Sequence, residues 1–207
     1  KPGMKEALEE YVKNGGILIT TFMSGIVGQS DNVYLGGYPG PLREMAGVWV
    51  EEIDALAPEQ KNKAKFADGS IAACGLLCDL MHLEGAKALA SYEEDFYAGM
   101  PAASKNTYGK GTTYYIATQF EEEGLAKILD QAVQEAGVSS VIPEETGLEV
   151  VTRVSDTTRF YFVMNFTDEE QILPESLTGK KDMISQKMTE HGMKLKKWDV
   201  LLLEEHL

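Results

Sequence analysis

Adjacent acidic residues are the best candidates for catalytic side chains in this sequence. They include the pairs Glu9-Glu10, Glu51-Glu52, Glu93-Glu94 and Glu144-Glu145. A glycosidase needs two carboxylates that face each other across a sugar, roughly 5–10 Å apart. Neighbouring residues of a strand point to opposite faces of the sheet, so such a pair cannot do this alone. We interpret these acids as solvated surface charge and predict no catalytic residue.

The sequence also contains few candidate residues for nucleophilic catalysis. The three histidines, His82, His191 and His206, are scattered, and none has a Ser or Cys in a nucleophile turn nearby. Neither Gly-x-Ser-x-Gly nor the phosphate-cradling Gly-x-x-x-x-Gly-Lys occurs. The glycine pair Gly36-Gly37 is better explained by a turn. We therefore expect no cofactor-binding residues.

The two cysteines, Cys74 and Cys78, lie four residues apart. On a helix this spacing could place two metal ligands on one face, but no His or further Cys accompanies them at useful spacing. On a strand the same spacing also puts both on one face. We predict two buried thiols in a reducing compartment, and no metal site.

Composition limits the classes of partner. The chain has 207 residues, of which 43% are hydrophobic and 25% charged, which is typical of a globular protein. Its net charge of −14 argues against nucleic acid and anionic membranes as partners. No apolar run approaches the length of a membrane-spanning helix. We expect a cytoplasmic protein.

The elements expected to position these residues form an α/β domain followed by a smaller β domain. Apolar periodicity predicts helices over residues 2–14, 41–46 and 121–136. Strands are predicted over 17–22, 48–53 and, between 64 and 118, in a series separated by turns such as Gly109-Lys110-Gly111. The segment 17–22 reads as a strand buried on both faces, which predicts a mostly parallel core with an antiparallel extension.

Residues 139–147 form the best candidate linker. Beyond them the chain reads as β at 148–154, 159–165, 169–173 and 198–204. We therefore predict two domains, an α/β domain over 1–140 and a small antiparallel, β-sandwich-like domain over 146–207. Aromatic residues such as Trp49 and Trp198 could stack on sugars, but at strand positions we expect them in the core.

A parallel sheet joins its strands by crossovers, yet only one helix precedes the strand at 17–22. The α/β layer is therefore expected to be incomplete at its N-terminus. This strand should have an exposed edge, or an edge paired with another segment or a neighbouring molecule.

The longest loop follows that strand and runs from Ser24 to Gly40. Long loops inside compact domains are usually functional or interfacial. This one carries no convergent charged or metal-binding groups, but it is rich in apolar and aromatic side chains, which protein contacts use. The predicted interface residues are Ile26, Val27, Val33, Tyr34, Leu35, Tyr38 and Pro39.

The loop and its surroundings resemble one family. The phrases SGIV, LGGYPGPLRE, AGVWVEE and DFYAGMPAASKNTYGKGTTYYIAT are similar to the middle domain of the glycoside hydrolase family 42 β-galactosidases, and LEVVTRVSDTTRFYFVMNFTD to the start of their C-terminal β domain. The resemblance implies a flavodoxin-like, class I glutamine-amidotransferase-like layer that mediates trimerisation. It also implies that both catalytic carboxylates lie in a (β/α)8 barrel N-terminal to this chain. We therefore expect a non-catalytic C-terminal fragment of a retaining β-galactosidase.

Two alternatives remain open. A stand-alone enzyme of the amidotransferase-like fold would require a nucleophilic Cys at a strand-to-helix elbow, where this chain has Met23-Ser24-Gly25. A carbohydrate-binding β module over 148–207 is the other, and glycan binding by that segment would distinguish it.

Overall fold

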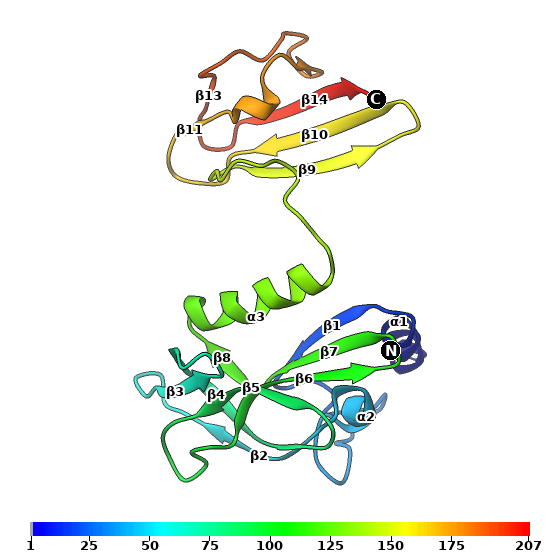
Figure 1. Ribbon diagram of the computed structural model, residues 1–207, viewed down its shortest axis with the longest axis vertical. Coiled ribbons are helices and arrows are strands. Elements are labelled where there is room, and N and C mark those ends of the chain that lie inside the picture. The colour runs from blue at the N-terminus through cyan, green and yellow to red at the C-terminus, as the bar shows by residue number, and fades with distance from the viewer. Residues whose placement is uncertain (1) are drawn as a thin grey trace. The chain divides into compact units, whose positions relative to one another are not determined.

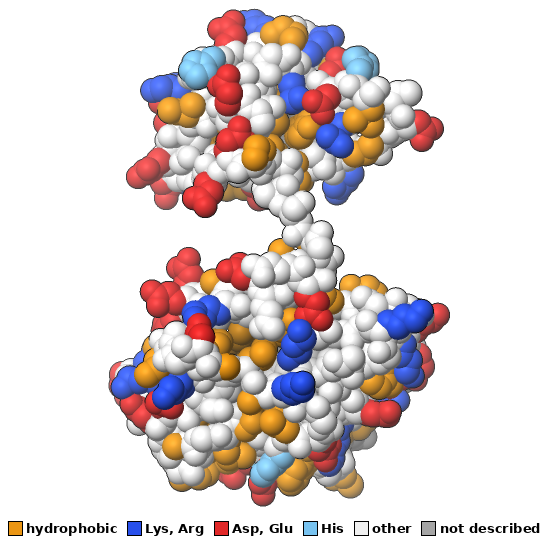
Figure 2. Space-filling view, viewed as in Figure 1, with side chains coloured by type: hydrophobic (Ala, Val, Ile, Leu, Met, Phe, Trp, Pro, Cys, Tyr) orange, Lys and Arg blue, Asp and Glu red, His pale blue; other side chains and the backbone are white. Residues whose placement is uncertain are grey.

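The computed structural model describes residues 2–207 and divides into two compact units. The first ends at Val138 and the second spans Ser139–Leu207. Figure 1 shows a mixed α/β first unit and a smaller second unit made mainly of strands. On the visible face of both units, acidic, basic and hydrophobic side chains are interspersed (Figure 2). No helix in the described part of the chain is both long and apolar enough to cross a membrane.

The first unit follows the predicted order of elements closely. Its helices are α1 (Met4–Lys13), the short η1 (Gly40–Leu42) and α2 (Arg43–Ala46), and α3 (Glu122–Glu135). Its strands are β1 (Ile17–Thr21), β2 (Val48–Ala55), β3 (Asn62–Phe66), β4 (Ile71–Leu83), β5 (Lys87–Tyr92), β6 (Pro101–Tyr108), β7 (Gly111–Ile116) and β8 (Thr118–Phe120). The predicted helices and the turn at Gly109-Lys110-Gly111 are confirmed.

The strands form one sheet in the order β1-β7-β6-β5-β3-β4-β2, with β8 paired to β4. Within the described residues β1 and β7 are the parallel pair, and every other pairing in this sheet is antiparallel. The prediction of a mostly parallel core is therefore wrong. Short turns join β3 to β4 and β6 to β7, and a longer loop, residues 93–100, joins β5 to β6. Each is a hairpin connection, which makes its two strands run in opposite directions.

Strand β1 lies at the edge of this sheet. In the structure of residues 2–207 it pairs with β7 and with no other strand, so the predicted sheet edge is confirmed. The expectation that β1 is buried on both faces is wrong, because Ile19 is 36% exposed. The unpaired side of β1 presents backbone donors and acceptors that can template association.

Helix α3 covers one face of the sheet through a narrow buried stripe. Gly124, Ile128 and Ala132 are buried at the helical period, and the acidic N-terminal turn suits the helix dipole. The other residues expected on its apolar face, Leu125, Leu129 and Val133, are only partly covered, at 37–45% exposed. The apolar stripe of α3 is therefore only partly covered by the described residues.

The cysteines lie in the core beneath α3, as predicted. Cys74 and Cys78 are both fully buried and unpaired, among residues that include Tyr92, Tyr114 and Ile128. Burial raises the pKa of the Cys74 thiol to about 12. A thiol held protonated in this way is structural rather than nucleophilic.

A second layer of core carries a buried acid. Asp79 is 1% exposed, and the Tyr115 hydroxyl donates a 2.7 Å hydrogen bond to its Oδ2. Its Oδ1 has no partner among the described residues. Burial raises the pKa of Asp79 to about 7, despite the opposing effect of the hydrogen bond from Tyr115.

The second unit is antiparallel, as expected. Its strands are β9 (Glu149–Val154), β10 (Thr158–Met164), β11 (Gln171–Ile172), β12 (Lys181–Asp182), β13 (Lys194–Leu195) and β14 (Val200–His206), with the turn η2 (Glu175–Leu177). The order β12-β14-β10-β9 forms one sheet, and β11 pairs with β13. Its core contains the large side chains Tyr161, Leu177, Leu195 and Leu203.

Replacing Asp79 with Asn should stabilise the first unit at neutral and alkaline pH. The folded protein holds the Asp79 proton up to about pH 7, whereas an unfolded aspartate loses it near 3.9. Stability therefore falls as pH rises from 4 to 7 and stays reduced above 7. Asp79→Asn should gain roughly 1–3 kcal/mol at pH 8 and weaken this dependence, as calorimetry between pH 4 and 8 would measure.

The control is Asp31→Asn in the exposed loop. It should leave the pH profile unchanged. Identical profiles for the two variants would show that Asp79 is not the group responsible.

Candidate functional site

The long loop between β1 and η1, residues 22–39, contains a small hairpin. Val27 and Val33 form an isolated antiparallel bridge, and the Tyr34 amide donates to the Ile26 carbonyl at 2.9 Å. At its tip the Gly28 amide donates to the Asn32 carbonyl at 2.8 Å. The loop therefore has backbone order of its own, although it belongs to no sheet.

The second half of the loop is fastened to β2. Tyr38 and Val50 exchange both backbone hydrogen bonds, at 3.0 and 2.7 Å. The Gly36 carbonyl accepts two further hydrogen bonds, from Trp49 Nε1 at 2.9 Å and from a terminal guanidinium nitrogen of Arg43 at 3.2 Å. This carbonyl thus joins the loop to β2 and α2.

Five residues form what we call the anchor cluster: Arg43, Trp49, His82, Glu51 and Glu84. The guanidinium carbon of Arg43 lies 5.5 Å from the centre of the Trp49 ring, and the His82 ring stacks on that ring with centroids 4.8 Å apart. Glu84 accepts two hydrogen bonds from Arg43, at 2.6 and 2.5 Å, which lowers the pKa of its carboxyl. His82 Nε2 lies 2.9 Å from a carboxylate oxygen of Glu51.

Exposed ion pairs of this kind contribute little stability individually. Their geometric effect is larger, because a bidentate partner orients the guanidinium plane against the indole. The anchor cluster therefore positions the two donors that hold the Gly36 carbonyl.

The structure divides the seven predicted interface residues into two groups. Val27, Val33, Tyr34 and Leu35 are exposed, at 48%, 52%, 38% and 99% respectively. Ile26 and Tyr38 are half-buried and Pro39 is buried. Tyr38 packs against the cluster that contains Val48, Val50 and Met81, so it supports the loop from below.

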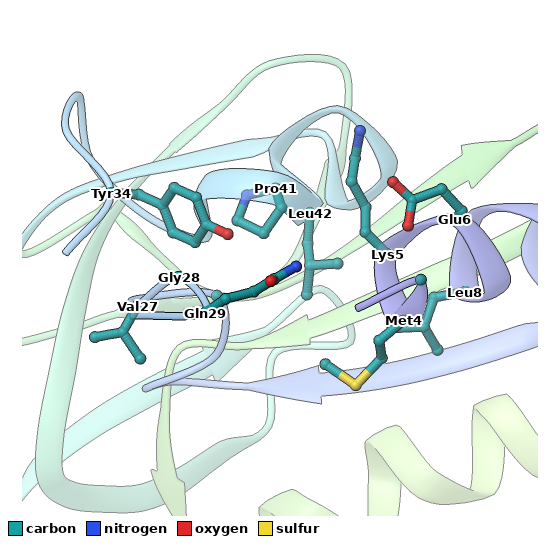
Figure 3. A pocket seen from close by; sticks show the side chains of 12 residues that line it. Met4, Lys5, Glu6, Leu8, Val27, Gly28, Gln29, Tyr34, Pro41 and Leu42 are labelled. Carbon is teal, nitrogen blue, oxygen red and sulfur yellow. The ribbon is translucent and has the colours of Figure 1, made fainter. Parts of the chain in front are cut away.

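Beside the exposed group lies a surface pocket of about 310 Å³. Its walls come from the first turns of α1 (Met4, Lys5 and Leu8), from the loop (Gln29 and Tyr34) and from Pro41 and Leu42. Figure 3 shows the Tyr34 ring beside Pro41, with Met4 and Leu8 on the far side of the hollow. The pocket is mixed in polarity and is the size of one or two side chains.

Catalytic chemistry finds no support in the part of the chain that the structure describes. Those residues hold no group of three or more His, Cys, Asp or Glu side chains placed to bind a metal. Where an amidotransferase-like enzyme would need a cysteine, Met23 takes the left-handed conformation, with φ +65°, and is 58% exposed. A thioether cannot act as that nucleophile.

The sequence patterns did not predict which residues hold the loop in place. Arg43, Trp49 and His82 come from three different elements, and no spacing in the sequence connects them. The available signal was Gly36-Gly37, which we explained by a turn. Both glycines do adopt positive φ, and a Cβ on Gly37 would lie 2.0 Å from Trp49 Nε1.

Two family models match the chain. The model described as the β-galactosidase trimerisation domain covers residues 1–139, and that described as the β-galactosidase C-terminal domain covers residues 147–205. Among curated proteins, β-galactosidase LacA of Lactobacillus acidophilus is 45% identical over 98% of this chain, and BgaA of a Planococcus species is 39% identical over 98%. The chain spans only 30–31% of the length of these two relatives.

Solved structures of β-galactosidases also match nearly the whole of this chain. The crystal structure of a β-galactosidase from Bacillus circulans sp. alkalophilus superposes with a TM-score of 0.86 at 36% identity, over 98% of this chain and 31% of that one. A catalytic mutant of Gan42B, a GH42 β-galactosidase from G. stearothermophilus, gives a TM-score of 0.84 at 31% identity, over 100% of this chain and 30% of that one.

Alanine at Gly37 should loosen the loop far more than alanine at Gly36. Both positions have φ above +90°, so each substitution incurs strain of about 1 kcal/mol. Only at Gly37 does the new methyl group meet the Trp49 ring, which should add roughly 1–3 kcal/mol and displace the indole.

Thermal unfolding and the emission maximum of Trp49 would measure both effects. A Trp198→Phe background leaves Trp49 as the single tryptophan. Equal destabilisation of the two alanine variants, with no change in emission, would contradict the close approach of Gly37 to the indole.

Proposed function

The chain belongs to the glycoside hydrolase family 42 β-galactosidases, and we propose that it is the non-catalytic assembly region of an enzyme that hydrolyses terminal β-D-galactosides. The hydrolysis would follow a retaining mechanism in the family's (β/α)8 barrel, which is not part of this chain. One observation carries the assembly role: an ordered loop displays Val27, Val33, Tyr34 and Leu35 to solvent, within the region that matches the trimerisation domain model.

The exposure of these side chains favours a protein partner. Leu35 is 99% exposed on a loop that is held at both ends, so its side chain buries almost no apolar surface against this chain. Clustered apolar groups on the surface mark interaction sites, and hydrophobic burial is the main driving force of association. The neighbouring pocket beside Tyr34 could receive a side chain of the partner.

We propose that the partner is another subunit of a homotrimer. A closed ring of three uses heterologous contacts, in which one patch meets a different patch on the next subunit. The loop would therefore reach across to a surface unlike itself, and could help wall the neighbouring subunit's substrate pocket. The β-galactoside itself would be bound only through the barrel.

We further propose that β1, β7, α1 and α3 belong to a flavodoxin-like, class I glutamine-amidotransferase-like layer. The parallel pairing of β1 with β7 and the position of α3 on one sheet face support this. The free edge of β1 is then the place where another strand of the longer protein, or of a neighbouring subunit, would pair.

Two finer features of the organisation are also proposals. We place the trimerisation domain at 1–140 and the C-terminal β domain at 146–207. We place the protein in the cytoplasm, a location supported by Cys74 and Cys78, which lie buried and unoxidised in the core.

Charge on the exposed part of the loop should dissociate the full-length enzyme. We predict that Val33→Asp combined with Leu35→Asp weakens subunit association about tenfold or more, because two anionic groups would be desolvated at the contact. Thermal stability of the isolated chain should hardly change, since both side chains already face solvent. Sedimentation velocity would give the oligomeric state.

The control is Ile172→Asp combined with Ile184→Asp, at equally exposed positions of the second unit. It should leave the trimer intact. A trimer of unchanged stability in the loop variant would rule the interface role out.

Residues 1–207 on their own should not hydrolyse galactosides. The acids that sequence reasoning singled out as pairs include Glu51 and Glu94, which are engaged by His82 and Lys63 rather than facing another carboxylate. A chromogenic β-galactoside assayed across successive purification steps would test this. Turnover at constant specific activity would contradict the assignment.

A further inference from the structure

Two aromatic rings stand together on the surface of the second unit. Phe166 is 51% exposed and Trp198 is 63% exposed, with ring centroids 5.8 Å apart and planes inclined by 64°. The expectation that Trp198 belongs to the core is therefore wrong. We call these two residues the aromatic pair.

A buried asparagine builds the support of the aromatic pair. Asn165 is fully buried, and its side-chain amide donates to the carbonyls of Glu169 at 2.8 Å and Leu195 at 2.9 Å. The backbone carbonyl of Asn165 accepts a hydrogen bond from the Trp198 backbone amide at 2.8 Å, and its backbone amide donates to the Asp199 carbonyl at 3.1 Å. One residue thus joins the loop after β10 to the loop before β14 and sets the two rings side by side.

The backbone at Trp198 is strained. Its φ is +69°, a conformation that bulky residues rarely adopt. Such a conformation costs about 1–3 kcal/mol and is concentrated at functional sites. The strained residue places its large ring in solvent, where the ring contributes little to the core. The local structure is therefore better explained by display of the indole than by stability.

Charged side chains surround the aromatic pair, alongside the half-exposed Val200. The ammonium group of Lys197 lies 5.1 Å from the centre of the Trp198 ring and forms an ion pair with Asp168. Lys194 of strand β13 forms a second ion pair, with Glu170 of the loop before β11. The core of a protein interface is depleted in such charges and needs a far larger area than two rings. A ligand with both an apolar face and hydroxyl groups fits better, because its C–H face can stack on indole while its hydroxyls bond to charged groups.

We propose that the aromatic pair is a binding site for a neutral saccharide. A pyranose ring stacks on the indole of Trp198, Phe166 limits one side, and Asp168 and Lys197 hydrogen-bond the hydroxyls. The site is shallow and open, so its dissociation constant is about 1–10 mM.

Fluorine NMR provides a direct test, because the chain has two tryptophans. The unaltered chain is labelled with 5-fluorotryptophan, and the two resonances are assigned by the loss of one signal in Trp198→Phe. Titration with lactose, up to about 100 mM, should shift the Trp198 resonance with saturation. The Trp49 resonance should stay in place, since its ring is held in the anchor cluster. Sorbitol at equal concentration serves as the control for solvent effects.

Variants sharpen the test. Phe166→Ala and Asp168→Asn should each weaken binding about tenfold, with Trp198 still present as the reporter. Equal shifts of both resonances, no saturable shift, or unchanged binding in both variants would overturn the proposal.

The sedimentation of the full-length enzyme distinguishes a saccharide from a protein partner. Trp198→Ala should leave the trimer unchanged, because saccharide binding is independent of the assembly role. A dissociated trimer would identify the aromatic pair as a subunit contact and refute the saccharide site. If the loop variant keeps the trimer while lactose still shifts Trp198, the assembly role fails and the saccharide site stands.

Discussion

The hydrogen bond from the Trp49 indole to the Gly36 carbonyl is the contact on which the exposed loop depends. It fixes a backbone segment that lies outside the sheet, and it works only because Gly37 has no side chain to separate the two. Arg43 donates to the same carbonyl and is itself oriented by Glu84. Without these contacts, Val33 and Leu35 would sit on a free loop, and ordering that loop would oppose any association.

The same division between support and display recurs in both units. In the first unit Tyr38 and Pro39 pack inward while Leu35 faces solvent. In the second, Asn165 is buried while Phe166, the next residue, is exposed. Each surface element thus has a buried or hydrogen-bonded neighbour that holds it. The two tryptophans have opposite roles in this scheme, since Trp49 anchors a loop and Trp198 is displayed by one.

The sheet of the first unit leaves backbone and apolar groups uncovered. Its hairpins make most of the sheet antiparallel and self-contained, but β1 joins it only through the parallel pair with β7. One helix, α3, covers its face incompletely and leaves Leu129 and Val133 partly exposed. Unpaired backbone groups and partly covered apolar side chains lie in the same unit as the exposed loop. The buried carboxyl of Asp79 adds a second feature that fold stability alone does not explain.

Local sequence patterns predicted the helices, most strand positions, the buried cysteines and the apolar character of the long loop. These follow from local periodicity, turn residues and side-chain chemistry, which act between residues close in the chain. Its phrases also carried the resemblance to family 42, which the comparisons with known proteins confirmed. Tertiary packing makes the sheet mostly antiparallel, leaves four of the seven loop residues exposed and places Trp198 outside the core. Strand order, the Arg43–Trp49–His82 stack and the support of Trp198 by Asn165 all join residues distant in sequence. Their placement depends on how hairpins and loops pack together, which no local pattern encodes.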